Sequence, residues 1–259
     1  MEVKKQVEIL KIKGGVNEYL KDDVIVEHPF TIFINDKELV TILCTPRDLK
    51  ELTVGFLFSE NYIDDINEIK AMDIGEGCKT INVIVKERTQ TLRDKYRGRR
   101  TITSGCGKNT SFYNIVDSKT SMKITKRLPI SPSSVVQLMG EFNKLSVLFK
   151  ETGGVHSCGL GRVDGILFYA EDIGRHNALD KVLGSGHLSG LSFEDTLVLS
   201  TGRISSEMLI KAAKRKIPLI ISRSAPTSLA VELAKELGIS LIGFARGNKM
   251  NIYNNFSEY

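Results

Sequence analysis

Alternating apolar and polar positions predict a β-hairpin in the first third of the chain. Residues 24–35 are rich in β-branched and aromatic side chains, and residues 38–44 form a second apolar run. Asn35 and Asp36 separate the two runs, and both residue types favour tight turns. We therefore expect two antiparallel strands joined at this turn, and a further strand at residues 80–85.

The segment after the hairpin has the composition of a helix start. Thr45 is a typical N-cap residue, Pro46 fits the first helical position, and Asp48 completes a capping box. The pattern predicts an amphipathic helix whose apolar face consists of Leu49, Leu52, Val54, Phe56 and Leu57.

A longer helix is predicted in the middle of the chain. It begins at Ser131-Pro132, runs to about Glu151, and is stopped by Gly153 and Gly154. Its core-facing side is predicted to consist of Val135, Leu138, Met139, Phe142, Leu145 and Phe149.

Strands and helices alternate in the rest of the chain. The predicted strands are residues 165–170, 196–200, 217–222 and 240–244. The predicted helices are residues 176–183, 205–214 and 227–237. This alternation indicates βαβ units, and thus an α/β fold with a mainly parallel sheet and right-handed crossovers.

Composition and charge narrow the class of protein. The chain has 259 residues, of which 41% are apolar and 26% charged, values typical of a globular protein. Its net charge of +5 suits an anionic ligand but is too small to indicate nucleic-acid binding. No apolar run reaches the roughly 18 residues of a membrane span, and residues 1–15 lack the apolar core of a signal peptide. We therefore expect a cytoplasmic protein without membrane contact.

The four cysteines are isolated from one another and form no Cys-x-x-Cys pair, which argues against a zinc ribbon or a dithiol redox motif. Cys106 stands between Gly105 and Gly107, with Lys108 close by. Glycines permit an exposed loop, and a neighbouring ammonium favours the nucleophilic thiolate. The residues alone leave two interpretations open for Cys106, a reactive thiol and a buried loop cysteine.

The other three cysteines offer weaker candidates. Cys158 lies in a strand-like segment with His156 nearby as a possible base, but this setting favours a core position. Cys44 ends an apolar strand and is also expected in the core, whereas Cys78 receives no role. Four scattered histidines do not form a zinc ligand set, so we expect no metal held by the protein itself.

Polar loops follow the predicted strands, at the edge of the sheet where α/β proteins bind ligands. Each of four successive loops carries an arginine beside small or hydroxyl residues: Arg175, Arg203, Arg223 and Arg246. Guanidinium groups and helix N-termini commonly hold phosphates. The loops therefore predict an anionic or nucleotide-like ligand. For His176, which stands beside Asp172 and Arg175, a ligand-contact or proton-transfer role and a purely structural role both stay open.

A basic segment spans residues 86–100, with seven Lys or Arg residues against two acidic ones. Such charge runs are most often solvated surface loops. The alternative interpretation is a docking surface for an acidic partner or a polyanionic ligand.

Several of these segments resemble one family, the formate dehydrogenase accessory sulfurtransferases (FdhD type). The strongest match is residues 171–182, Glu-Asp-Ile-Gly-Arg-His-Asn-Ala-Leu-Asp-Lys-Val. Further motifs match in the same order at residues 45–52, 152–156, 201–203 with Glu207, 224–230 and 243–247. The resemblance covers about residues 22–253.

The resemblance implies a sulfurtransferase that acts through a cysteine persulfide. A cysteine desulfurase would load sulfur onto Cys106, which would pass it to the molybdenum or tungsten of a bis(molybdopterin guanine dinucleotide) cofactor needed by formate dehydrogenase. The cofactor would be bound by Arg203, Arg223 and the segment Phe244, Ala245, Arg246, Gly247, Asn248 and Lys249, with Asp172, Arg175 and His176 shaping the site. The alternatives are a cofactor-binding chaperone without covalent chemistry and, less favoured, a nucleotide hydrolase.

The implied fold is a C-terminal cytidine-deaminase-like α/β domain at residues 101–259, which carries the cysteine loop and the cofactor site. A smaller N-terminal domain with the basic linker would occupy residues 1–100, and a homodimer is implied. One motif departs from the family: many members have Cys-x-x-Cys in the loop, whereas Thr103 stands where the first cysteine would be. A single thiol suffices for a persulfide carrier, and whether Cys158 assists Cys106 stays open.

Overall fold

The computed structural model describes residues 1–86, 101–102, 108–109 and 123–255. Cys106 and nearly all of the basic segment lie outside these residues. The short strands β7 (Thr101–Ile102) and β8 (Lys108–Asn109) pair with each other, and Ile102 lies opposite Lys108.

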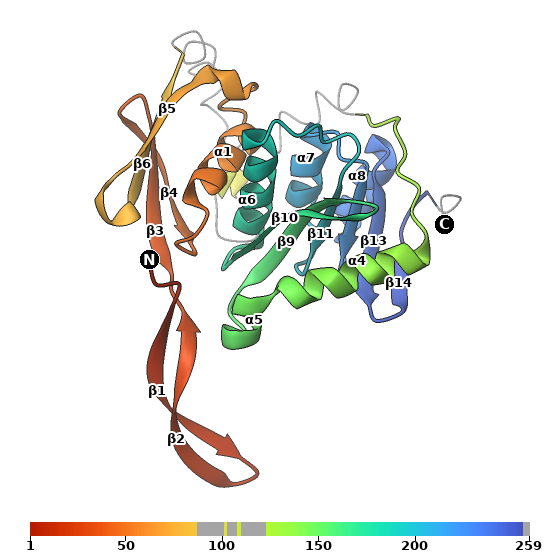
Figure 1. Cartoon of the computed structure of the whole chain (residues 1–259). Coiled ribbons are helices and arrows are strands. Elements are labelled where there is room, and N and C mark those ends of the chain that lie inside the picture. Colours follow the sequence, from red (N-terminus) through yellow and green to blue (C-terminus); the bar gives the residue numbers. More distant parts are fainter. Residues whose placement is uncertain (87–100, 103–107, 110–122, 256–259) are drawn as a thin grey trace.

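The described residues 1–86 form a hairpin, a four-stranded sheet and one α-helix (Figure 1). The hairpin consists of β1 (Lys4–Lys13) and β2 (Val16–Ile25). The sheet has the order β4-β3-β6-β5 and consists of β3 (His28–Ile34), β4 (Lys37–Cys44), β5 (Ile69–Ile74) and β6 (Thr80–Val85). The helices are α1 (Leu49–Ser59) and the short 3₁₀ turns η1 (Ile66–Glu68) and η2 (Glu76–Cys78). The predicted hairpin turn is confirmed, because Asn35 and Asp36 both have positive φ angles.

A six-stranded sheet organises the C-terminal part, in the order β10-β9-β11-β12-β13-β14. The strands are β9 (His156–Arg162), β10 (Gly165–Asp172), β11 (Leu197–Ser200), β12 (Leu219–Ser222), β13 (Ser240–Arg246) and β14 (Lys249–Ile252). The central strands β11, β12 and β13 are parallel, whereas β9, β10 and β14 are attached antiparallel. The predicted α/β class is confirmed, with the parallel pairing confined to the centre of this sheet.

Helices cover both faces of the six-stranded sheet (Figure 1). One face carries α6 (Arg175–Leu188), α7 (Ser206–Lys214) and α8 (Ser228–Leu237), and the other carries α4 (Pro132–Leu145). Alternate residues of one strand serve the two cores, since Val198 faces α6 to α8 while Leu197 and Leu199 face α4. None of the described helices is long and apolar enough to span a membrane.

The predicted capping box of the first helix is wrong. Helix α1 begins at Leu49, after Asp48 with a left-handed φ of 53° and no side-chain cap. The Thr45 hydroxyl instead accepts a hydrogen bond from the Ile173 amide at 3.2 Å. A tertiary contact to the loop after β10 has replaced the local capping interaction.

The predicted single helix from Ser131 to Glu151 is two helices. The N-cap at Ser131 is confirmed, but the helix ends before Ser146 and a second one, α5 (Val147–Thr152), begins. The buried Glu171 carboxylate accepts the first amides of α5, from Leu148 and Phe149, each at 3.0 Å. This re-capping turns α5 away, so the predicted core positions Leu145 and Phe149 are exposed, whereas the other four predicted positions are buried.

Helices α1 and α6 join the N-terminal part to the C-terminal part at a very close crossing. A β-carbon on Gly55 would lie 1.8 Å from the Asp180 carbonyl oxygen, and one on Gly184 would lie 1.9 Å from the Glu51 carbonyl oxygen. Only glycine permits this approach of two helix backbones. The predicted domain boundary at residue 100 falls next to residues outside the described part, so it stays a prediction.

Candidate functional site

The carboxyl ends of the three parallel strands lie at one edge of the sheet. Strand β9 runs in the opposite direction, so its first residue, His156, lies at the same edge. The Thr201 amide after β11 donates to the Ser157 carbonyl at 3.0 Å, and the Ser157 amide donates to the Thr201 hydroxyl at 2.9 Å. These bonds hold the start of β9 against the end of β11.

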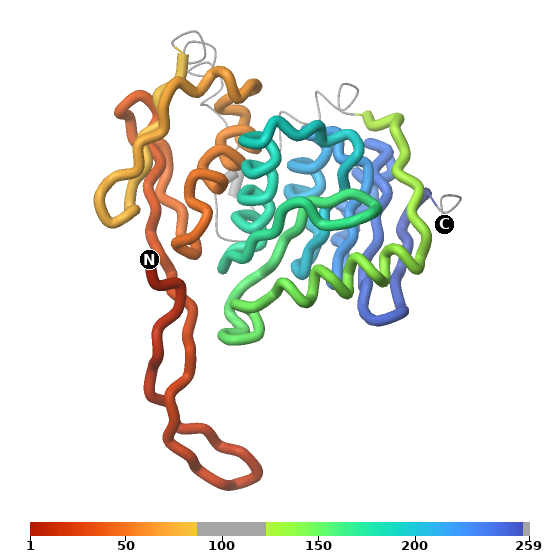
Figure 2. The backbone as a smooth tube through the Cα atoms, in the orientation of Figure 1, coloured from red at the N-terminus to blue at the C-terminus, as the bar shows by residue number. Residues whose placement is uncertain are grey.

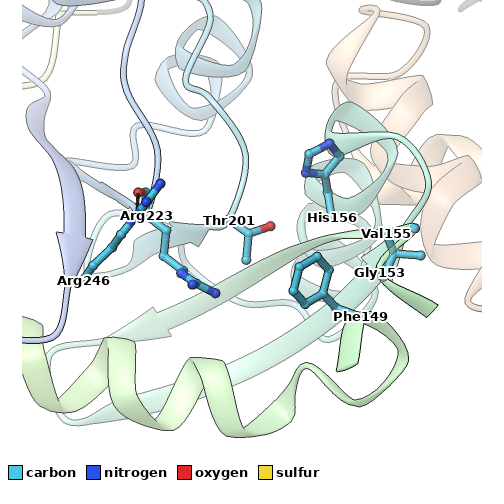
Figure 3. A pocket seen from close by; sticks show the side chains of 8 residues that line it. Phe149, Gly153, Val155, His156, Thr201, Arg223 and Arg246 are labelled. Atoms are coloured by element: carbon cyan, nitrogen blue, oxygen red, sulfur yellow. Dashed lines mark hydrogen bonds between the residues drawn. The ribbon is translucent and has the colours of Figure 1, made fainter. Parts of the chain in front are cut away.

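A cavity of about 410 Å³ opens at this edge. Figure 3 shows the Arg223 and Arg246 side chains on one side, the rings of Phe149 and His156 on the other, and Thr201 between them. The full lining consists of Phe149, Gly153, Gly154, Val155, His156, Thr201, Arg223 and Arg246. The site thus offers a cationic side and an aromatic side, which suits a ligand that combines an anionic group with a flat ring.

The cationic side is held by the loops that carry it. The Arg246 Nε donates to the Arg223 carbonyl at 2.7 Å, which ties the end of β13 to the loop after β12. The Ser224 hydroxyl donates to the Thr201 carbonyl at 2.8 Å, which ties that loop to the one after β11. These hydrogen bonds connect three successive loops and so restrain the backbone that carries the two guanidinium groups.

His156, on the aromatic side, is kept neutral by its surroundings. Burial lowers the pKa of its imidazole below the ordinary value of 6.5, and the nearby charges of Arg175, His176 and Arg203 lower it further. A neutral ring adds no charge to the cavity and retains one donor and one acceptor nitrogen.

His176, the second residue of α6, contacts the start of α7. Its Nε2 lies 3.1 Å from a Glu207 carboxylate oxygen at the start of α7, and 3.4 Å from the Ser205 hydroxyl. Within the described residues, His176 thus contacts Glu207 and Ser205, and its predicted role toward a ligand stays a prediction.

Asp172 is a buried structural group at the start of α6. Its carboxylate lies 2.7 Å from the Lys181 Nζ, and both side chains are fully buried. It also accepts hydrogen bonds from the amides of Gly174 at 2.9 Å and Thr45 at 3.0 Å. Asp172 thus fixes the loop from which Arg175 begins α6, and shapes the site from behind.

The structure brings together only part of the predicted cofactor-binding set. Arg223 and Arg246 line the cavity, and Arg203 and Arg175 lie close enough to act on His156 electrostatically. The other predicted residues do not line the cavity within the described part of the chain. They lie along β13 and its hairpin to β14: Phe244, Ala245, Gly247, Asn248 and Lys249.

Sequence reasoning missed the aromatic side. Phe149 was expected in the core, and His156 was considered only as a base for Cys158. The signal that pointed to them was the Gly153-Gly154 motif before His156. These glycines also line the cavity, and Gly153 has the left-handed φ of 67° that ends α5.

Burial makes two of the cysteines unreactive as nucleophiles. Cys44 and Cys158 are fully buried, and burial raises the pKa of each thiol to about 12. Cys158 lies 3.7 Å from the Ser200 hydroxyl, inside the sheet. The predicted core positions of both are confirmed, and neither forms a thiolate near neutral pH.

No group of three or more metal-ligating side chains occurs among residues 1–86, 101–102, 108–109 and 123–255.

Comparisons with known proteins agree along nearly the whole chain. The model of the FdhD/NarQ family matches residues 25–258. A Listeria monocytogenes protein named "Sulfur carrier protein FdhD" is 41% identical over 260 residues, which cover 100% of this chain and 99% of that protein. A Bacillus subtilis protein of the same name is 40% identical over 246 residues, covering 95% and 94%.

A solved structure shows the same fold. It is described as a putative formate dehydrogenase accessory protein from Desulfotalea psychrophila, and it matches with a TM-score of 0.80 at 29% identity. The match covers 99% of both chains.

Proposed function

The chain belongs to the FdhD/NarQ family, and from this premise we propose that it is a sulfur carrier that serves formate dehydrogenase. Full-length relatives at about 40% identity are named sulfur carrier proteins, and the matching solved structure is described as a formate dehydrogenase accessory protein. The resemblance drawn from the sequence motifs is thereby confirmed at the level of the family.

Cys106 is the proposed sulfur acceptor. Its thiolate attacks the terminal sulfur of a persulfide on a cysteine desulfurase, so that one S–S bond forms as another breaks and the donor cysteine leaves as a thiolate. Burial narrows the choice, because Cys44 and Cys158 are fully buried thiols with pKa values raised to about 12, which leaves Cys106 and the half-buried Cys78. Lys108, two residues after Cys106 in the sequence, supplies an ammonium group of the kind that favours the thiolate form of a nearby cysteine.

The final destination of the sulfur is proposed to be the molybdenum or tungsten of a bis(molybdopterin guanine dinucleotide) cofactor, bound as a substrate. The Cys106 persulfide gives its terminal sulfur to the metal, a reduced metal centre supplies the two electrons that make it a sulfido ligand, and the Cys106 thiolate is regenerated. The observation that carries this proposal is the cavity with Arg223 and Arg246 on one side and the rings of Phe149 and His156 on the other. Phosphates suit the guanidinium groups, and a guanine ring suits the aromatic side.

The basic segment at residues 86–100 is the proposed docking surface for the desulfurase. It ends only a few residues before Cys106, and a persulfide must pass between the two proteins without loss to other thiols. Attraction between this segment and an acidic face of the donor would speed their encounter and weaken with salt.

Intact-mass measurement tests the sulfur step. After incubation with a cysteine desulfurase and cysteine, the protein should gain about 32 Da, and a reductant should remove the added sulfur. Cys106→Ser should abolish both this adduct and the maturation of formate dehydrogenase, whereas the matched variant Cys78→Ser should keep both. Normal maturation with Cys106→Ser would favour the alternative, a cofactor-binding chaperone without covalent chemistry.

A further inference from the structure

Helix α5 carries the Phe149 ring to the cavity. Figures 1 and 2 show α4 running along one face of the six-stranded sheet, followed by the short α5, after which the chain turns back into β9. Phe149 keeps 41% of its surface exposed, and its side chain lines the cavity (Figure 3). An aromatic ring left open at a cavity wall offers a stacking surface to a flat ligand.

The residue at the start of α5 does not cap this helix. Ser146 stands at the N-cap position, where a serine hydroxyl ordinarily accepts an amide of the first turn. Here the Ser146 side chain makes no such bond. Its hydroxyl lies instead 3.2 Å from that of Ser157 and 3.1 Å from that of Tyr169. The first amides of α5 therefore need an acceptor from another part of the chain.

Glu171 supplies this acceptor from strand β10. Its carboxylate accepts the amides of Leu148 and Phe149 at 3.0 Å each, and the residue is only 4% exposed. Burying a carboxylate is costly unless such donors compensate it, and the positive end of a helix favours the charge further. A cap from Ser146 would fix only the first turn of α5. The cap from Glu171 fixes α5 relative to the sheet.

The same end of β10 also places the second ring of the aromatic side. In the antiparallel pairing of β9 with β10, Glu171 lies opposite Ser157, and Asp172 lies opposite His156. The residue that holds Phe149 is thus one position from the strand partner of His156. The distance between the two rings therefore depends on the bonds that Glu171 makes to α5.

We propose that Glu171 is a positioning residue for the flat ring of the ligand. It is not among the described residues that line the cavity, and it acts through the backbone of Phe149, whose ring it holds at the cavity wall. This inference rests on the proposed function, because the ring in question is the guanine of the proposed cofactor. Arg223 and Arg246 bind the phosphates without its help, so Glu171 governs one half of the ligand and not the other.

The affinities for GDP and for inorganic pyrophosphate, measured by calorimetry on the full chain, test this division. Phe149→Ala deletes the ring and should weaken GDP binding by about five- to a hundredfold, as expected for one stacked base. Glu171→Gln keeps the shape but offers one acceptor oxygen to two amides, and should weaken GDP binding by about three- to tenfold. Neither variant should change the pyrophosphate affinity by more than about twofold, because this ligand has no ring.

A double-mutant cycle distinguishes positioning from general damage to the fold. If Glu171 acts through Phe149, the variant with both changes should bind GDP no more weakly than Phe149→Ala alone. The matched control is Glu194→Gln, which removes the same charge from an exposed carboxylate before the start of β11, at the sheet edge opposite the cavity. The control should leave both affinities unchanged.

Three results would overturn the positioning role of Glu171: an unchanged GDP affinity in Glu171→Gln, equal losses for GDP and pyrophosphate, or additive losses in the double variant. A wild type that binds GDP no better than pyrophosphate would overturn this inference together with the proposed guanine site. Sulfur loading of Cys106, measured by intact mass, reports on the carrier function separately. Its absence in the wild type would overturn the proposed function and leave the role of Glu171 standing.

Discussion

The Nε of Arg246 donates a hydrogen bond to the backbone carbonyl of Arg223 at 2.7 Å. The side chain therefore has two roles, since it braces the loop after β12 and presents its remaining donors to the cavity. Removing the Arg246 side chain would delete one cationic group of the cavity. It would also loosen the backbone of Arg223, which carries the other.

We predict that Arg246→Ala weakens the binding of GDP by about one to two orders of magnitude, on the roughly 1.5–3 kcal/mol typical of charge-assisted hydrogen bonds. The wild-type affinity should also fall with added salt, because the contacts are ionic. Isothermal titration calorimetry measures both effects.

The matched control for this prediction is Arg162→Ala. Arg162 is an exposed arginine at the far end of β9, away from the cavity edge. Its removal changes the net charge equally and should leave GDP affinity unchanged. Equal losses in both variants would mean that overall charge, and not the cavity, determines binding.

The crossing of α1 and α6 gives a prediction on stability. Gly184→Ala places a β-carbon 1.9 Å from the Glu51 carbonyl, so the helices must separate, and we expect a loss of about 3 kcal/mol or more. Gly140→Ala is the control, since Gly140 lies in α4 with nothing within 4 Å. There, alanine should stabilise by about 0.5–1 kcal/mol through helix propensity. Urea unfolding of the two variants compares these effects directly.

The crossing also marks a limit of what the sequence predicts. Helix α1 itself was predicted from its apolar spacing, and its buried residues Leu52, Val54 and Leu57 confirm the interpretation. The beginning of α1 was not predicted correctly. The Thr45 hydroxyl accepts a hydrogen bond from Ile173, more than a hundred residues away, and does not cap the helix locally. Local patterns reveal elements, whereas long-range contacts decide their ends.

His187 gives a prediction on the pH dependence of stability. Its ring stacks on Phe58 with centroids 3.5 Å apart, and burial, followed by the charge of Arg215, lowers its pKa from 6.5 to about 3. Between these pH values the unfolded chain binds a proton that the folded ring does not. The stabilising contribution is therefore complete above pH 6.5 and is lost as the pH falls toward 3.

His187→Phe keeps an aromatic ring on Phe58 and removes the titration. The unfolding free energy of the wild type should fall more steeply with acid than that of the variant, by at most about 1.4 kcal/mol per pH unit for one proton. Urea titrations from neutral pH down to the acid limit of folding measure the two slopes. Parallel slopes would show that His187 takes up its proton equally in both states.

The buried cysteines give a chemical prediction. Iodoacetamide at mildly alkaline pH should leave Cys44 and Cys158 unmodified in the folded protein, because burial hides both thiols and raises their pKa to about 12. Both should react once the chain is unfolded. Peptide mass mapping identifies the labelled sites. Labelling of Cys158 in the folded state would reopen a relay between Cys106 and Cys158.

The cationic side of the candidate site could be predicted from the sequence, whereas its aromatic side could not. Arginines that directly follow parallel strands lie at the carboxyl-end edge of the sheet, and Arg223 and Arg246 line the cavity there. His156 arrives at the same edge only because β9 runs antiparallel to β11, a pairing that local sequence does not reveal. Phe149 is displaced from its helical register by the carboxylate of Glu171, which re-caps α5.

The bonds between the Thr45 turn and the buried ion pair have a consequence for anyone who divides this chain. Lys181 donates to the Thr45 carbonyl at 3.1 Å, and Thr45 in turn donates to Asp172. A fragment that starts at residue 101 lacks α1 and the Thr45 turn. It would expose the Asp172–Lys181 ion pair and the Gly184 surface of α6 to water, close to Arg175 at the start of that helix. Such a fragment would aggregate or bind nucleotide poorly even though it contains every residue of the cavity, so ligand assays require the intact polypeptide.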